Sequence, residues 1–344
     1  MNGTNGTNSS TINAAPSLGR LRQFGLVRFS GPDNLSFLQG QVSNDTNRLT
    51  AGAPLLAAYS TPQGRVAAVL HLLPHSGGVM AILPREIVQA TVERMRKYVL
   101  RSKVRIEDVS DQFAVFGRNG SGGSDTAPAD GADGLPIPVA GRAYVERDGI
   151  AVACVGSDRQ APATSRYWVI GTVQELAARG LDGAAHDPRA EHAWRLADIR
   201  AGLPQIYAAT REAFVAQMLN LDLIDGISFT KGCYTGQEII ARTQHLGRIK
   251  RRLHRLRLPA ASWAVGQAVH LTDGRSGRLT EVAAAGAEFE ALAVLTLETP
   301  AAGAAAAGAG SADTSEAQDM ASGGSASTLV SAIELPLPYS LTPA

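Results

Sequence analysis

The residue of this sequence with the most chemistry to offer is Cys233, in the segment SFTKGCYTGQEIIARTQHLG at 228–247. Thr235 and Glu238 have the spacing of a capping box, which predicts a helix that starts at Thr235 and ends at the last glycine of the segment. Cys233 then precedes the helix, where free backbone N–H groups and the positive end of the helix dipole stabilise a thiolate. Lys231 adds a positive charge, so the local pattern favours a reactive cysteine about as strongly as an inert, buried one.

Other reactive centres find little support in the sequence. His245 could approach Cys233 in space, but no residue that would orient its ring can be identified, so a cysteine–histidine pair is a weak hypothesis. The seven histidines show no metal-ligand spacing, and there is no phosphate loop or dinucleotide fingerprint. The second cysteine, Cys154, lies in the apolar run IAVACV and is predicted to be a small core residue.

Two further features admit both a functional and a structural interpretation. The basic run RIKRRLHRLRL at 248–258 could receive an acidic ligand tail or RNA phosphates, but no aromatic residues interleave with it to stack on bases. Arg255 and Arg257 share one face of a strand, and a solvated strand face is the favoured interpretation. Trp194 lies on a predicted helix, where a buried core position is favoured over a stacking wall for a planar ligand.

Length and composition limit the class of protein. A chain of 344 residues, 44% of them hydrophobic, can form two or three domains, and a net charge of +1 gives no global attraction to nucleic acid or anionic membranes. Two cysteines fit a reducing compartment, and neither a secretory signal nor an apolar run long enough to cross a bilayer is visible. We therefore expect a cytoplasmic protein with no membrane partner and no direct binding of nucleic acid.

The segments that position these residues alternate between strands and helices, which predicts an α+β fold. Strands are expected at 25–30, 55–59, 66–73, 104–109 and 167–171. Helices are expected after a Ser30 cap and at 85–98, 173–179 and 188–201. Beyond residue 247 only short apolar strands alternate with turns, which predicts a small closed β-domain.

Three stretches rich in Gly, Ala, Ser and Asp contain too few large apolar residues to offset the entropy of ordering them. They are predicted to be a disordered tail at 1–17 and low-complexity loop insertions at 117–134 and 301–327.

Several motifs in order along the chain resemble the YgfZ family. The run KGCYTGQE at 231–238, followed by Ala241 and Arg242, resembles the family's signature. Its other motifs are matched by LQGQVSND at 38–45, KYVLRSKV at 97–104, AGLP at 201–204 and PLPYSL at 336–341. The resemblance implies a three-domain ring related to the T-protein of glycine cleavage. In this ring, residues 18–246 form two interleaved α/β domains and residues 247–344 form a C-terminal β-barrel.

The same resemblance implies a function and a set of site residues. It implies binding of tetrahydrofolate or a folate derivative and a role in making or maintaining iron–sulfur enzymes, including those that methylthiolate tRNA. These enzymes or their assembly factors would be transient partners, and any catalysis would be that of a tetrahydrofolate-dependent transferase. Cys233 and Lys231 are then the catalytic residues. The positions carried over to folate binding are Phe24, Trp194, Tyr234, Gln237, Glu238 and Arg242.

Position 200 departs from the pattern of T-proteins. Arg200 stands where those proteins have an acidic residue that helps to grip the pterin, and an arginine cannot accept the pterin's N–H donors. No aspartate equivalent to the one that T-proteins use on the folate side can be identified either. Two alternatives stay open: an aminomethyltransferase-like one-carbon enzyme, and a scaffold that binds RNA or proteins with a structural Cys233.

Overall fold

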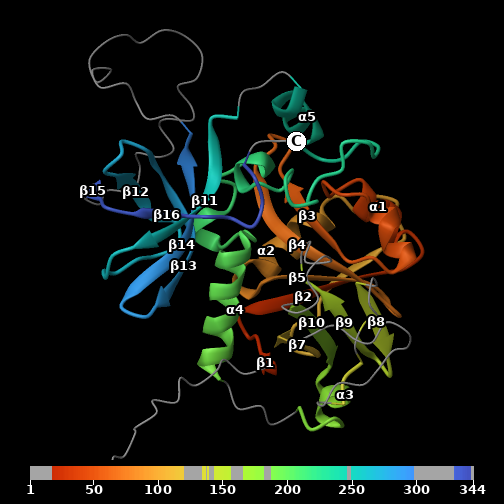
Figure 1. Cartoon of the computed structure of the whole chain (residues 1–344). Helices are drawn as coiled ribbons and strands as arrows, with labels where there is room; N and C mark the ends of the chain where they lie inside the picture. The colour runs from red at the N-terminus through yellow and green to blue at the C-terminus, as the bar shows by residue number, and fades with distance from the viewer. Residues whose placement is uncertain are drawn as a thin grey trace, which may run out of the picture.

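The computed structural model describes residues 18–119, 134–136, 138, 143–155, 166–181, 187–245, 249–297 and 329–341. The predicted tail, the insertion at 301–327 and residues 120–133 of the other insertion lie outside these ranges. The described chain forms three β-sheets, and the long helix α4 (Pro188–Ala201) runs between the C-terminal sheet and the other two (Figure 1). None of the described helices is both long enough and apolar enough to cross a membrane.

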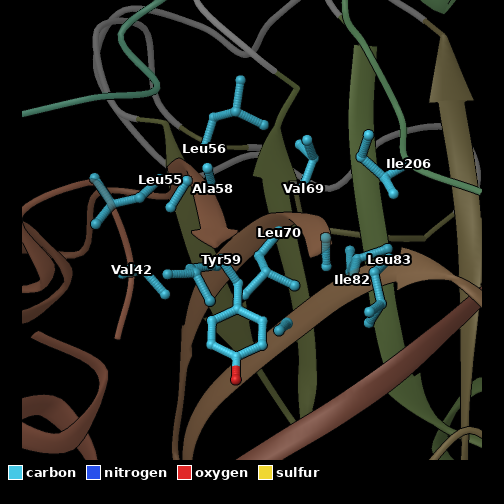
Figure 2. Close-up of a cluster of buried hydrophobic side chains, with 14 of the residues drawn as sticks. Val42, Leu55, Leu56, Ala58, Tyr59, Val69, Leu70, Ile82, Leu83 and Ile206 are labelled. Atoms are coloured by element: carbon cyan, nitrogen blue, oxygen red, sulfur yellow. The ribbon is translucent and has the colours of Figure 1, made fainter. Parts of the chain in front are cut away.

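The first sheet is antiparallel and has the strand order β3-β4-β5-β2-β6. Its strands are β3 (Leu55–Ser60), β4 (Val66–His75), β5 (Gly78–Pro84), β2 (Phe24–Ser30) and β6 (Arg105–Asp108). The side chains of β3 are buried on both faces, and their apolar run is continuous rather than alternating, as covering both faces of a sheet requires. Figure 2 shows this core, in which Val42 and Ile206 pack against residues of β3, β4 and β5.

The helices beside the first sheet differ from prediction at their starts. The first, α1 (Asn34–Gln39), begins four residues after the predicted Ser30 cap. Gly31 lies at φ +101, and a Cβ there would meet the carbonyl oxygen of Lys103 at 2.4 Å, so the chain must turn before it can become helical. The predicted helix at 85–98 is divided into η2 (Arg85–Ile87) and α2 (Val88–Arg96).

The second sheet has the order β1-β7-β10-β9-β8 and joins the first through the chain's N-terminal segment. Its strands are β1 (Leu18–Arg20), β7 (Phe113–Asn119), β10 (Arg166–Thr172), β9 (Ile150–Cys154) and β8 (Tyr144–Arg147). β1 belongs to this sheet and β2 to the other, so the two units are interleaved. Residues 117–119 belong to β7, so the predicted start of the low-complexity insertion at 117 is wrong. A capping box of Thr172 and Glu175 starts α3 (Val173–Ala177).

The C-terminal sheet has the order β15-β12-β13-β14-β11-β16. Its strands are β11 (Arg251–Leu258), β12 (Ala268–Leu271), β13 (Ser276–Ala285), β14 (Glu288–Thr296), β15 (Leu329–Val330) and β16 (Ile333–Leu335). β15 and β16 are the two edges, yet only two residues separate them in the chain. Because three residue steps span at most about 11 Å, the edges must lie close together and the sheet must curl. This curled sheet is the barrel-like domain that the sequence predicts.

The segment after α4 links the first sheet to the C-terminal sheet, because Val66 of β4 pairs with Phe214 and the Tyr207 hydroxyl donates to Glu281 of β13. It contains η5 (Ala208–Thr210) and η6 (Ala216–Leu219). Gly202 ends α4 in the left-handed conformation at φ +65, as the sequence predicts for a helix at 188–201. The hydroxyl of Tyr339 donates to the carbonyl oxygen of Gly202 at 2.8 Å, so the end of the described chain packs back against α4.

A buried carboxyl joins α4 to the C-terminal sheet. Glu281 of β13 is 1% exposed, accepts a hydrogen bond from the Tyr207 hydroxyl at 2.5 Å and lies 3.3 Å from Arg195 of α4. Burial raises the pKa of Glu281 from 4.5 to about 7, since Arg195 offsets only part of the desolvation. Between these two values the folded protein holds a proton that the unfolded chain releases, so stability falls as pH rises through this window.

We therefore expect Glu281→Gln to remove part of the pH dependence of stability. In the wild type, the free energy of unfolding should drop between pH 5 and pH 8 by on the order of 2–3 kcal/mol more than in the variant. Urea denaturation at the two pH values measures this difference. Glu288→Gln, at an exposed position of β14, is the matched control and should keep the drop of the wild type. An equal drop in wild type and Glu281→Gln would contradict the expectation.

Candidate functional site

Cys233 lies in an exposed loop that precedes α5 (Gln237–His245). Its neighbours Thr230 and Gly232 are exposed as well, and the ring of Phe229 is 41% exposed. The loop therefore presents the thiol to solvent. This exposure excludes a buried position for Cys233, and the reactivity of its thiol stays a prediction.

Lys231 anchors the cysteine loop to the end of α1 and to the residues that follow this helix. Its ammonium donates to three backbone carbonyl oxygens, those of Gln39 at 2.7 Å, Val42 at 2.7 Å and Asn44 at 2.9 Å. The same nitrogen lies 4.8 Å from the centre of the Tyr234 ring. Burial lowers the pKa of Lys231 to about 8. Because this value is still above neutral pH, the ammonium form remains the dominant one.

These contacts limit the hydrogen bonds that Lys231 can make to Cys233. An ammonium has three N–H donors, and three carbonyl oxygens already accept from them, so no donor remains for a hydrogen bond to Cys233. The three bonds hold the cysteine loop against the chain at 39–44, and the assignment of Lys231 as a catalytic residue stays a prediction.

The helix after the cysteine starts later than predicted. α5 begins at Gln237 rather than Thr235, because Gly236 lies at φ +83 and packs against the 61–65 turn, where a Cβ would meet the Thr61 carbonyl oxygen at 2.6 Å. The backbone amide of Thr235 donates to the carbonyl of Gly40, and that of Tyr234 to the side chain of Gln237. These amides point to partners other than the thiol, so the predicted stabilisation of a thiolate by free amides is not seen for them.

The remaining residues of the signature occupy both sides of α5. Tyr234 is buried beneath Lys231, and burial raises the pKa of its hydroxyl to about 12. The side-chain oxygen of Gln237 accepts a hydrogen bond from the backbone amide of Tyr234. Glu238 and Arg242 lie on the exposed face of the helix. Their assignment to folate binding stays a prediction. The side chain of His245 lies outside the described part of the chain.

Phe24 and Trp194 meet elsewhere, in an aromatic cluster between the first two sheets and α4. Trp168 of β10 is its centre, with the Phe24 ring 5.0 Å away and the Trp194 ring 4.7 Å away, centroid to centroid. Trp194 is 2% exposed and Phe24 4%, so neither ring presents a face to solvent. The favoured interpretation of Trp194 as a core residue is therefore confirmed, and its contact with folate stays a prediction.

Buried polar groups surround this aromatic cluster. Arg166 of β10 donates to Asp198 of α4 at 2.6 Å, and both side chains are almost fully buried. The amide nitrogen of Gln205 lies 3.1 Å from a ring nitrogen of His71. Burial lowers the pKa of His71 to about 3, and the charge of Arg166 acts in the same direction, so the ring is neutral. Burial also raises the pKa of Asp198, although Arg166 opposes this shift.

Four polar atoms of this cluster are buried without a hydrogen-bond partner among the described residues. They are three donors, Arg166 Nη2, Trp168 Nε1 and Trp194 Nε1, and one acceptor, Gln205 Oε1. Buried polar atoms in proteins are rarely left unpaired, so such a group indicates a place for water or a polar ligand. Apart from Trp194, these residues were not predicted from the sequence. Asp198 could have been found, because it lies one helical turn after Trp194.

Arg200 faces away from this cluster. Its guanidinium pairs with Glu290 of β14 at 2.8 Å, on the side of α4 that contacts the C-terminal sheet. Asp198, two residues earlier, supplies the buried carboxyl group that the sequence lacks at position 200. The arginine at position 200 therefore lies outside the aromatic cluster, and the cluster contains a buried carboxyl group, that of Asp198.

Three arginines of the basic run on β11 lie beside acidic partners. Arg252 is buried and pairs with Asp222 at 2.6 Å, and Arg255 pairs with Glu290 at 2.7 Å. Arg257 lies 3.6 Å from Glu288 at the surface. A structured strand face, rather than a landing site for phosphates, thus describes this part of β11. Within the described ranges no three His, Cys, Asp or Glu residues come together as a group that could hold a metal ion.

Comparisons with known proteins agree on one family and one fold. No family model matches the sequence. The chain is 30% identical over 233 residues to a "tRNA-modifying protein YgfZ" of Colwellia psychrerythraea, covering 68% of this chain and 69% of the relative. It is 31% identical over 275 residues to the protein of that name from Yersinia pseudotuberculosis, covering 74% and 80%. The glycine cleavage system aminomethyltransferase T of Bartonella henselae superposes with a TM-score of 0.58 at 14% identity, covering 81% of this chain and 78% of that one. At that identity the likeness concerns the fold alone.

Proposed function

The chain belongs to the family of tRNA-modifying YgfZ proteins, and we propose that it acts in tRNA modification as a folate-binding accessory protein of iron–sulfur enzymes. One observation carries the proposal: the exposed thiol of Cys233 on a loop that Lys231 fastens to the first domain. A thiol so presented can reach a second protein. Such a role fits a cytoplasmic protein in which neither Cys154 nor Cys233 forms a disulfide.

The chemistry of a cysteine suits contact with iron or sulfur. Thiolate sulfur is a soft ligand that favours Cu(I), Zn(II) and the iron of iron–sulfur clusters. An accessible cysteine thiolate also takes sulfane sulfur from the persulfide of a donor protein, whose thiol leaves, and passes it on in the same way. Because the loop is exposed and the partner must leave again, we expect transient contact of Cys233 with an iron–sulfur enzyme or its assembly factor.

The buried cluster around Trp168 fits the polar edge of a pterin. Asp198 and Gln205 supply acceptors for its N–H groups, while Arg166 and Trp168 supply donors for its oxygen and ring nitrogens. Bound tetrahydrofolate would bring a reduced pterin that carries one-carbon groups. Because Phe24 and Trp194 are buried, the pterin reaches them only when the packing around α4 opens.

Tetrahydrofolate is therefore expected to quench tryptophan fluorescence, and two of the three tryptophans should carry the signal. Trp168 and Trp194 adjoin the cluster, whereas Trp263 packs in the C-terminal sheet's own core. After correction for ligand absorbance, Trp194→Phe should lose much of the quenching and Trp263→Phe should retain it. Unchanged quenching in Trp194→Phe would remove the assignment of Trp194 to the folate site.

The proposed function is tested in bacteria that lack their YgfZ protein. Expression of this chain should restore the methylthiolated nucleosides of tRNA, measured by mass spectrometry of hydrolysed tRNA. A modified nucleoside made without an iron–sulfur enzyme serves as the internal control and should not change. Stable expression of the chain without restoration would contradict the proposal. We do not propose aminomethyl transfer as the activity of this chain, because its likeness to the T-protein concerns the fold alone.

A further inference from the structure

The connection between α2 and β6 holds the most exposed large apolar side chain of the described residues. Leu100 is 86% exposed, and the ring of Tyr98, two residues earlier, is 40% exposed. Val99 and Val104 pack against the first core, so the loop already has its inward contacts. A single exposed leucine needs no explanation, but one that shares a loop with an accessible tyrosine and several cations indicates a surface that meets a partner.

The loop keeps its shape without a partner. Its backbone amides at 98 and 99 donate to carbonyl oxygens in the last turn of α2. The backbone amide of Lys103 donates to the carboxylate of Asp33 at 2.6 Å. A ligand therefore meets a preformed surface, and its binding does not have to order the loop.

Three cations at the end of α2 have structural roles. Arg94 pairs with Glu212 at 2.7 Å. The guanidinium of Arg96 donates twice to the Ile106 carbonyl oxygen, at 3.0 and 2.6 Å, and so fixes the end of α2 to β6. Lys97 follows the last residue of the helix, where a positive charge offsets the helix dipole. These contacts account for the three side chains without a ligand.

Three further cations have no such partners. Arg101, Lys103 and Arg105 are exposed, and none of them forms an ion pair or a side-chain hydrogen bond with a described residue. No acidic residue stands between them in the sequence. The flanking Glu107 is already bound by an arginine of β2 at 3.0 Å, and the carboxylate of Asp33 is engaged by a backbone amide. The three side chains are therefore available to bind anions.

An exposed tyrosine among such cations fits RNA better than other anions. Lysine and arginine bind phosphates, and an aromatic ring stacks on an unpaired base. An acidic protein surface offers no base to stack, and a membrane would call for more apolar side chains than Leu100 supplies. The basic run on β11 lacks both features, because three of its arginines lie beside carboxylates and no aromatic residue interleaves with them.

The expectation that the chain does not bind nucleic acid rests on its net charge of +1. Net charge describes the long-range attraction exerted by the whole molecule, and a local surface can still bind a polyanion.

We propose that the segment 98–105 is a contact surface for RNA, in which Arg101, Lys103 and Arg105 bind phosphates and Tyr98 stacks on an unpaired base. Leu100 then lies against a base or a ribose and loses its contact with water. The choice of RNA rests on the proposed role in tRNA modification, under which the chain works beside tRNA. The surface itself uses no residue of the cysteine loop or of the aromatic cluster.

Fluorescence anisotropy with a labelled, unmodified tRNA transcript tests this proposal. The wild-type chain should bind with a Kd on the order of micromolar at about 50 mM salt, and the affinity should fall as salt rises. The double variant Arg101→Gln/Lys103→Gln should bind roughly tenfold more weakly, and its salt dependence should be shallower by about one phosphate contact for each cation removed. Tyr98→Leu keeps apolar packing but should weaken binding roughly fivefold or more, because stacking is lost.

The matched control is the double variant Arg189→Gln/Arg257→Gln, which removes the same amount of charge at two exposed positions outside the surface. It should bind the transcript as the wild type does. Thermal unfolding checks that the variants are folded, and Arg101→Gln alone serves if the double variant is not. No binding of the transcript by the wild type overturns the proposal, as does an equal loss of affinity in both double variants.

Competition identifies the class of partner. Poly-L-glutamate and vesicles of phosphatidylglycerol present negative charge without bases, and neither should displace the transcript when its charge concentration equals that of the RNA. Displacement by either one overturns RNA as the partner. A chain that binds the transcript at this surface but restores no methylthiolation contradicts the proposed function and supports the surface. Restored methylthiolation without binding of the transcript contradicts the surface alone.

Discussion

Replacing Lys231 by methionine is expected to release the Cys233 loop and abolish the rescue of tRNA methylthiolation, although the three sheets stay folded. The ammonium is the shared donor to the carbonyl oxygens of Gln39, Val42 and Asn44. Methionine fills a similar volume but donates nothing. Losing these bonds should destabilise the loop's attachment by roughly 2–5 kcal/mol, because unpaired buried carbonyls are costly.

Hydrogen exchange of the peptide that covers 228–236 measures this release. Exchange in Lys231→Met should be faster there than in the wild type, while the peptides of β4 and β14 should keep their protection. Lys97→Met, at an exposed position after α2, is the matched control and should leave both the loop and the rescue unchanged. Unaltered exchange of the loop in Lys231→Met would show that other contacts hold it.

Strands and helices with a clear apolar pattern could be predicted from the sequence. β3, β4, β10 and α4 lie where the sequence places them, because their cores and caps are encoded locally. Helix starts were less predictable. Gly31 and Gly236 adopt left-handed conformations that are set by neighbours distant in sequence, Lys103 and Thr61. A capping pattern alone does not reveal such close approaches.

The candidate site was predictable in part. The motif around Cys233 identified the loop that the structure exposes, and this exposure could not be foreseen from the local sequence, which fitted a buried cysteine equally well. The role of Lys231 could not be foreseen, since its acceptors lie about 190 residues earlier in the chain. The pair of Arg166 and Asp198 is likewise formed between β10 and α4, and only the packing of these elements brings it together.

Replacing Cys233 by serine is expected to have the largest effect on function and almost none on stability. The side chain is exposed, so Cys233→Ser should change the free energy of unfolding by no more than about 0.5 kcal/mol. Serine keeps the size of the side chain but removes the soft sulfur that the proposed contact with iron or sulfur requires. Cys154→Ser is the matched control, because Cys154 is the chain's other cysteine and lies half-buried at the end of β9.

The most direct measurement is the ratio of methylthiolated to unmodified nucleoside in tRNA from YgfZ-deficient cells that express each variant at equal levels. With Cys233→Ser the ratio should equal that of cells with an empty vector, and with Cys154→Ser it should approach that of the wild type. A ratio with Cys233→Ser equal to that of the wild type would contradict the account, since the exposed thiol would then have no part in the function.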